Sequence, residues 1–178
     1  THELSEYFLE NITEMLSKKG VKTSGWQEVA LHHSPEMNAR IAPRFAGVYC
    51  WSTIGKRDIV PYTVANEGYD VILCNVNNLY IDLAYNPHKD EPGLTWGGYV
   101  NEFTSFNILP YNIYCSAREN TAGEKNNLKT AGKGKIQLTE QSRPHIKGVQ
   151  AQLFSETIGS FDMVQYLSLN THLTLPTS

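Results

Sequence analysis

The stretch ILCNVNNLYIDLAYN, residues 72–86, decides the fold and raises a question about its own end. Residues 71–73 form an apolar run that is typical of a buried strand. Asparagines follow, and Tyr80 and Asp82 then come two residues apart, so we expect both side chains on the same side of the strand end. A core strand that ends in a phenol and a carboxylate predicts either a surface turn or the wall of a binding site.

The residues before this stretch alternate between helical and strand patterns. An apolar stripe predicts a helix over about 3–19, and strands are expected over 21–26, 45–51 and 70–75. Residues 54–69 are expected to be helical in their second half, with Pro61 in the first turn and Gly68 as the stop, whereas 31–44 resembles a loop. This alternation predicts an α/β fold with parallel strands and helices outside them.

The remaining residues break this rhythm. Residues 83–144 are rich in Pro and Asn, and we expect 119–135 to be a mobile loop because it is polar and contains several glycines and lysines. The part from Trp96 to Tyr114 is too aromatic to be without a role. A fourth strand is expected over 146–157.

Composition excludes several classes of protein. The chain has 178 residues, enough for one domain, with 40% hydrophobic and 11% aromatic residues. A net charge of −3 with dispersed charges predicts no nucleic-acid partner, and no apolar run is long enough for a membrane span. Cys50, Cys74 and Cys115 lack CxxC spacing, which argues against a disulfide framework and a zinc site. We expect no metal and no cofactor.

Each of the four expected strands ends in a large aromatic residue, a carboxylate, or both. These terminal residues are Trp26 with Glu28, Trp51, Tyr80 with Asp82, and Phe154 with Glu156. The carboxyl ends of parallel strands gather at one face, where active sites are built. Aromatic rings stack on the apolar faces of pyranose rings, and carboxylates accept from sugar hydroxyls, so the joint pattern predicts a sugar pocket.

Each residue also has a purely structural interpretation. A Trp at a strand end more often fills the hydrophobic core than lines a ligand-binding site. Asp82 could cap the following turn, and Glu156 could cap the helix after the fourth strand. Glu28 is interpreted as structural, pairing with a neighbouring strand. Only the repetition over four strands favours the functional interpretation.

Five motifs in order, SGWQE, VYCW, LYID, PGLTWGGYV and GVQAQLFSE, carry a family resemblance. The chain resembles, from about Leu4 to Tyr166, the second half of the catalytic barrel of glycoside hydrolase family 20, the β-N-acetylhexosaminidases. The resemblance implies a partial (β/α)8 TIM barrel, from the helix after strand 4 through strand 8.

The resemblance also implies roles for the aromatic residues. Trp26 and Trp51 would line the pocket for the 2-acetamido group. Tyr80 would be catalytic, by hydrogen-bonding the acetamide carbonyl oxygen as that oxygen attacks the anomeric carbon. Trp96 would stack on the next sugar or the aglycone.

The carboxylates Asp82 and Glu156 would bind ring hydroxyls of the terminal sugar. Phe154 stands where the family usually has Trp, and the resulting loss of indole area and of a donor predicts an altered substrate preference. The family's HxGGDE motif, which holds its catalytic Asp–Glu pair, does not occur in the chain. The resemblance implies an exo-acting, retaining hydrolase in which the substrate's own acetamide is the nucleophile, acting on glycans that end in N-acetylhexosamine.

The sequence also predicts where the domain begins and ends within the chain. We expect residues 1–166 to be the barrel portion and 167–178, with the sequence LSLNTHLTLPTS from Leu167, to be a non-native tail. A missing N-terminal half of the barrel would be needed for folding, so the chain alone is expected to be inactive. An extracellular, periplasmic or lysosomal location is favoured over the cytoplasm.

Two further classes remain open. The first is a non-catalytic carbohydrate-binding protein of the same fold, and the sequence upstream of Thr1 would discriminate it from the enzyme. The second is a doubly wound nucleotide-binding domain, which is disfavoured because no GxGxxG or GxxxxGK[ST] motif follows any expected strand.

Overall fold

The computed structural model describes the backbone of residues 2–172 and the side chains of residues 3–168. The chain divides into two compact units. The sheet unit comprises Thr1–Trp51, Ile59–Leu73 and Ile136–Gly148, and the loop unit comprises Ser52–Asp58, Cys74–Lys135 and Val149–Ser178.

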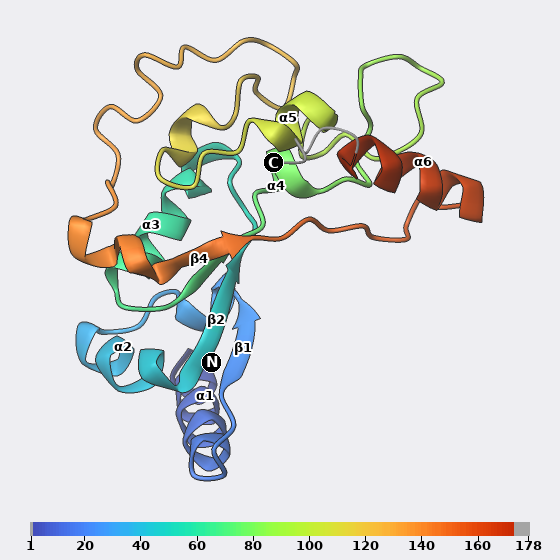
Figure 1. Ribbon diagram of the computed structural model, residues 1–178. Helices are drawn as coiled ribbons and strands as arrows, with labels where there is room; N and C mark the ends of the chain where they lie inside the picture. Colours follow the sequence, from blue (N-terminus) through green and yellow to red (C-terminus); the bar gives the residue numbers. More distant parts are fainter. Residues whose placement is uncertain (1, 173–178) are drawn as a thin grey trace. The chain divides into compact units, whose positions relative to one another are not determined.

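The sheet unit is built on a four-stranded sheet of order β1-β2-β3-β4 (Figure 1). Its strands are β1 Thr23–Trp26, β2 Phe45–Cys50, β3 Val71–Leu73 and β4 Ile146–Val149. The β1–β2 and β2–β3 pairs are both parallel, with Trp26 opposite Tyr49 and Tyr49 opposite Ile72. The predicted parallel α/β fold is confirmed.

Two helices of the sheet unit follow the sequence signals closely. Helix α1 covers His2–Ser17, and Gly20 follows it with a φ of 74°. Helix α3 covers Val60–Asn66 with its Pro in the first turn, where a missing N–H costs nothing, and Gly68 closes it with a φ of 92°.

The loop expected over 31–44 is wrong, because this segment contains helix α2, Pro35–Ile41. The Ser34 side chain accepts a hydrogen bond of 3.2 Å from the Met37 N–H, which caps the helix, and Pro35 occupies its first turn. Ile41 is fully buried, so packing stabilises this short helix. A turn of 3-10 helix, Ala42–Arg44, then leads into β2.

The core of the sheet unit is closely packed around β2. A side chain at Gly47 would put its Cβ 2.2 Å from the Cδ1 of Ile72, so the Ile72 side chain would have to move to accommodate it. The hydroxyl of the fully buried Tyr69 donates to the Oδ1 of Asn38 at 2.8 Å. Burial raises the pKa of Tyr69, which keeps this donor protonated.

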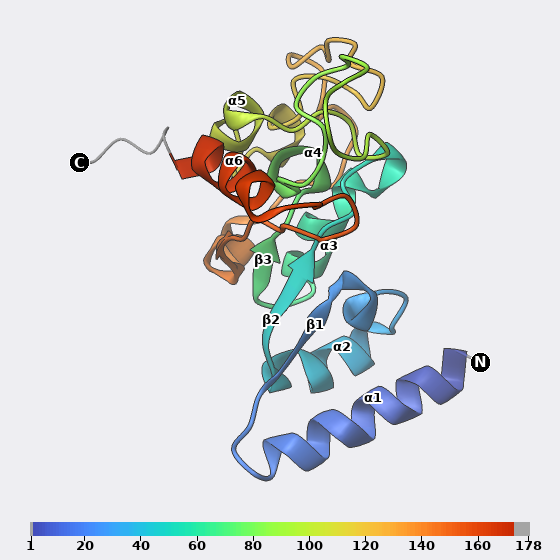
Figure 2. The ribbon, with the colours of Figure 1, turned by 90° about the vertical axis from the view of Figure 1, so that its right-hand side faces the viewer.

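In the described part of the loop unit there are three α-helices: α4 Val76–Leu79, α5 Glu102–Phe106 and α6 Phe161–His172 (Figure 2). Helix α4 contacts α5, and α5 contacts α6. A capping box between Asn101 and Thr104 begins α5. In the long loop, Glu119 and Lys125 form an antiparallel bridge. The mobility expected for 119–135 stays a prediction.

Two expected strands are shorter than their sequence patterns. The strand expected over 70–75 ends at Leu73, and helix α4 separates it from Tyr80. The strand expected over 146–157 ends at Val149. The chain turns between Tyr80 and Leu83, where the Leu83 N–H donates to the Tyr80 carbonyl at 3.2 Å. The prediction that Tyr80 and Asp82 alternate along a strand is therefore wrong.

Helix α6 continues across the boundary expected at residue 167. Leu167 is fully buried, and its carbonyl accepts a hydrogen bond of 3.2 Å from the Tyr85 hydroxyl. Residues 173–178 of the expected tail lie outside the described residues. The non-native origin of 167–178 stays a prediction.

Candidate active site

Three aromatic side chains meet in the loop unit, and we call Tyr80, Trp96 and Phe154 the aromatic cluster. The Tyr80 ring lies 5.9 Å from the Trp96 ring and 5.3 Å from the Phe154 ring, edge to face in both cases. Tyr80 is buried, whereas Trp96 is 46% and Phe154 37% exposed. The cluster therefore offers apolar ring surface to a ligand around a phenol.

Backbone pairing between segments that are distant in sequence positions this cluster. The Ile81 N–H donates to the Gln152 carbonyl at 2.9 Å, and the Gln152 N–H donates to the Leu79 carbonyl at 2.8 Å. This isolated parallel bridge holds Tyr80 beside the segment that leads to Phe154. The cluster is thus supported by a two-residue bridge rather than by a long strand.

The loop that carries Trp96 is held against the segment that follows Asp82. The Ala84 N–H donates to the Leu94 carbonyl at 2.9 Å. A Cβ at Gly93 would lie 2.6 Å from the Ala84 nitrogen, and the φ of Gly93 is 116°. Glycine is required there for the close approach of the two backbones.

Asp82 is a buried acceptor next to the cluster. It is 4% exposed, and the backbone N–H groups of Phe154 and of Asp82 itself lie near enough to its carboxylate to lower its pKa. Its Oδ1 is buried and has no hydrogen-bond partner among the described residues. Burial raises the pKa of Asp82, and the negative charge of Glu156 raises it further, against the effect of the two backbone N–H groups.

Glu156 is exposed in the turn that precedes α6. Helix α6 begins only at Phe161, so Glu156 lies outside the first turn of that helix. The cap interpretation of Glu156 is therefore wrong. Two carboxylates and the faces of the aromatic cluster occupy one region of the loop unit. This combination suits a ligand with hydroxyl groups and apolar C–H faces.

Trp26 and Trp51 belong to the sheet unit, at the carboxyl ends of β1 and β2 as expected. Trp26 is 41% exposed and lies edge to face with Tyr49, with ring centroids 5.9 Å apart. The indole N–H of Trp51 donates to the Oε1 of Glu28 at 3.1 Å. Glu28 therefore contacts the residue after the neighbouring strand, which fits its structural interpretation.

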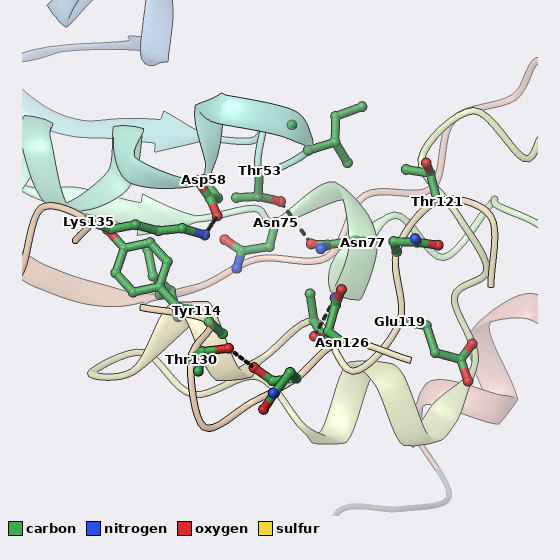
Figure 3. Close-up of a pocket in the computed structure, with 17 residues that line it drawn as sticks. Thr53, Asp58, Asn75, Asn77, Tyr114, Glu119, Thr121, Asn126, Thr130 and Lys135 are labelled. Atoms are coloured by element: carbon green, nitrogen blue, oxygen red, sulfur yellow. Dashed lines mark hydrogen bonds and ion pairs between the residues drawn. The ribbon is translucent and has the colours of Figure 1, made fainter. Parts of the chain in front are cut away.

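Sequence reasoning missed a cavity in the loop unit. It has a volume of about 510 Å³, and none of the seven predicted site residues lines it (Figure 3). Thr53, Asn75 and Asn77 are among its lining residues. The asparagines of the stretch 72–86 were the available signal, because polar residues directly after a buried strand need partners.

No helix within residues 2–172 is both long and apolar enough to cross a membrane. Among residues 3–168, whose side chains are described, no three His, Cys, Asp or Glu side chains are grouped so that they could hold a metal ion.

Comparison with known proteins identifies the family. Residues 1–170 match the family model of the glycosyl hydrolase family 20 catalytic domain. The chain belongs to this family of glycoside hydrolases.

Curated relatives agree with this assignment. The chain is 26% identical over 170 residues to a beta-hexosaminidase of Vibrio vulnificus, with 94% of this chain and 19% of that protein covered. It is 26% identical over 171 residues to the N,N'-diacetylchitobiase of Vibrio harveyi, with 92% of this chain and 18% of that protein covered. The chain thus spans about a fifth of the length of these relatives.

Solved structures support the fold. The GH20 exo β-N-acetylglucosaminidase of Vibrio harveyi in complex with N-acetylglucosamine superposes with a TM-score of 0.64 at 20% identity, covering 96% of this chain and 21% of that one. The GH20 β-N-acetylhexosaminidase of Streptomyces coelicolor A3(2) superposes with a TM-score of 0.61 at 20% identity, covering 94% of this chain and 28% of that one. The fold class is α/β, a partial (β/α)8 barrel.

Proposed function

We propose that this chain supplies the sugar-holding part of the active site of an exo-acting β-N-acetylhexosaminidase. Asp82 carries the proposal. Its carboxylate is 4% exposed, and its Oδ1 has no partner in the part of the chain that the structure describes. Buried acceptors in proteins are normally satisfied, so a sugar hydroxyl would complete this one. Membership of a glycoside hydrolase family supports the reaction class.

The mechanism that we propose uses the substrate's own acetamide as nucleophile. Its carbonyl oxygen forms a bond to the anomeric carbon while the bond to the leaving oxygen breaks, and an acid protonates that oxygen. The Tyr80 hydroxyl would donate to the attacking carbonyl oxygen and stabilise the cyclic intermediate. Its position in the aromatic cluster, 5.3 Å from the ring of Phe154, supports a preorganised donor.

The remaining roles concern substrate binding. Asp82 and Glu156 would accept hydrogen bonds from ring hydroxyls of the terminal N-acetylhexosamine. Trp96, 46% exposed, would stack on the following sugar of a glycan or glycoconjugate. The family resemblance assigns Trp26 and Trp51 to the acetamido group, and Phe154 would form an apolar wall that is smaller than the usual Trp.

The general acid and the orienting Asp are proposed to lie outside these 178 residues, since no HxGGDE motif occurs in them. The chain by itself is therefore proposed to be inactive. A carbohydrate-binding protein of the same fold is the alternative, because such a protein would keep Asp82 and the aromatic cluster without the acid.

The test is hydrolysis of 4-nitrophenyl N-acetyl-β-D-glucosaminide by the full-length protein that contains this chain. The proposal expects release of nitrophenolate, and slower release from the N-trifluoroacetyl analogue, because fluorine weakens the carbonyl oxygen as a nucleophile. Binding of N-acetylglucosamine without hydrolysis would replace the enzyme with the binding protein. Equal rates on the two substrates would overturn the substrate-assisted step.

A further inference from the structure

The loop unit holds a cavity that the proposed active site does not use. It has a volume of about 510 Å³, within the roughly 300–1,000 Å³ typical of small-molecule sites. Thr53 and Ile54 line it from one segment, Asn75 and Asn77 from the region of α4, and the loop 113–135 completes it (Figure 3). No residue of the aromatic cluster contributes to its lining.

Side-chain amides dominate the polar lining of this cavity, which includes Asn75, Asn77, Asn120, Asn126 and Asn127. Three of them stabilise their own loop, and among these the Oδ1 of Asn127 accepts from the Lys129 N–H at 3.2 Å. The Oδ1 of Asn120 accepts from the N–H groups of Ala122 and Glu124 at 2.9 and 3.0 Å. The Nδ2 of Asn126 donates to the Ala117 carbonyl at 2.9 Å. These bonds fix the cavity wall in place and leave Asn75 and Asn77 as the groups that can recognise a ligand.

Asn75 presents an unsatisfied acceptor. Its side chain is 1% exposed, and its Oδ1 has no hydrogen-bond partner within the described residues. The Oδ1 of Asn77 accepts from the Thr53 hydroxyl at 2.8 Å, which orients that amide and leaves its nitrogen as the donor. An acceptor and a donor on neighbouring amides match the hydroxyl and amide groups of a sugar.

The charges of the lining favour a neutral ligand. The ammonium of Lys135 forms an ion pair with Asp58, and it also lies 4.9 Å from the centre of the Tyr114 ring. The positive charge is thus neutralised inside the cavity, and Glu119 on the lining would repel an anion. Ile54 and Ile113 add apolar surface for C–H groups.

We propose that this cavity is a second carbohydrate site, which takes a neutral mono- or disaccharide between the amides of Asn75 and Asn77. It is separate from the site proposed at the aromatic cluster. The proposal goes beyond hydrolysis and does not depend on it, because a catalytically inactive protein of this fold would keep the same cavity.

The test is a calorimetric titration of the full-length protein with N-acetylglucosamine, compared with two tryptophan variants. Ala131 lines the cavity, and Ala131→Trp would fill it. Ala122 is exposed on the same loop and does not line the cavity, so Ala122→Trp is the matched control. We expect two sites in the wild type and in Ala122→Trp. Ala131→Trp is expected to keep one site, with unchanged hydrolysis where hydrolysis is present.

Asn77→Ala provides a milder variant in case the tryptophan disturbs folding, which melting curves would report. Loss of one amide donor is expected to weaken the second site by about tenfold, in line with the usual value of one hydrogen bond. Asp82→Asn should weaken only the first site. A single site in the wild type, two unchanged sites in both cavity variants, or displacement of the sugar from this site by inorganic phosphate would overturn the proposal.

Discussion

The backbone N–H of Phe154 lies beside the carboxylate of Asp82 and lowers its pKa, and the two residues thereby join the acidic and aromatic parts of the candidate site. The same carboxylate keeps its Oδ1 without a partner among residues that the structure describes. This oxygen is the acceptor that the proposed sugar hydroxyl would reach. Burial of this group affects stability as well as binding.

Asp82→Asn is expected to stabilise the fold at neutral pH. Folding raises the pKa of Asp82, mainly because burial disfavours its charged form, so the folded state binds this proton more tightly than the unfolded state does. The free energy of unfolding therefore falls as pH rises from about 4, the usual pKa of an Asp, through the raised pKa. The Asn side chain does not titrate, so the difference in free energy of unfolding between Asp82→Asn and the wild type should grow over that pH window.

Thermal melting of the wild type and Asp82→Asn between pH 4 and pH 7 measures this effect. Asp90→Asn, at an exposed carboxylate, is the control and should show no such trend. A difference in melting temperature that is constant or shrinks towards pH 7 would contradict the account of Asp82.

Asn78→Ala is expected to destabilise the loop unit by about 1–3 kcal/mol, the usual cost of leaving buried polar groups unpaired. Asn78 is fully buried, and its Nδ2 donates to the carbonyls of Thr104 and Ser116 at 2.7 and 3.1 Å. The side chain thereby links α4 to α5 and the long loop. Denaturant unfolding reports the change.

Asn107→Ala is the matched control for Asn78. Its Nδ2 also donates to a backbone carbonyl, that of Phe103 at 2.6 Å, and its Oδ1 accepts from the Arg118 guanidinium at 2.8 Å, but both bonds are exposed. The control substitution should lower the free energy of unfolding by less than about 0.5 kcal/mol, as is usual for surface changes. Equal losses in the two variants would show that Asn78 does not link these segments.

Gly93→Ala is expected to displace the loop that carries Trp96. The added Cβ would lie 2.6 Å from the Ala84 nitrogen, and the φ of 116° is strained for any other residue. Gly134 has a φ of 75° with no atom near its Cβ position, so Gly134→Ala shows the effect of backbone strain alone. Gly93→Ala should lower the free energy of unfolding by about 1–3 kcal/mol more than Gly134→Ala does, because overpacked sites carry such a cost. Similar stability and similar Trp96 fluorescence in both variants would contradict this role.

Trp96→Ala is expected to weaken the binding of oligosaccharide substrates more than the binding of small aryl glycosides. The ring is 46% exposed and is proposed to stack beyond the terminal sugar, so its loss should raise KM for a disaccharide roughly tenfold, equivalent to about 1.4 kcal/mol. Phe103→Ala, on the exposed face of α5, is the control. An equal change on both substrates would remove Trp96 from the second sugar position.

Sequence patterns predicted the elements whose signals are local. Pro61 and Gly68 delimited α3, and the apolar runs located β1, β2 and β3. Helix α2 was missed because it is short, although Ser34 and Pro35 are a helix-start signal. Its stability comes from burial of residues such as Ile41, which a local pattern does not reveal.

The sequence suggested residues of the candidate site by their type, but it did not predict how they are arranged. Tyr80, Trp96 and Phe154 meet as aromatic neighbours, but through a two-residue bridge at Gln152 instead of a strand end. Such pairing depends on contacts between distant segments, and sequence periodicity carries no information about them. The cavity beside Asn75 was missed for the same reason.

The central claim, that Tyr80 stabilises the reacting acetamide, is tested most directly by kcat and KM of Tyr80→Phe in the full-length protein. The substrate is 4-nitrophenyl N-acetyl-β-D-glucosaminide. Tyr85→Phe is the control, because it also loses a phenol hydroxyl, one that is part-buried and donates to the Leu167 carbonyl at 3.2 Å. We predict that Tyr80→Phe lowers kcat by about 10²-fold, as removal of one transition-state donor does, with little change in KM. An unchanged kcat in Tyr80→Phe would contradict the account.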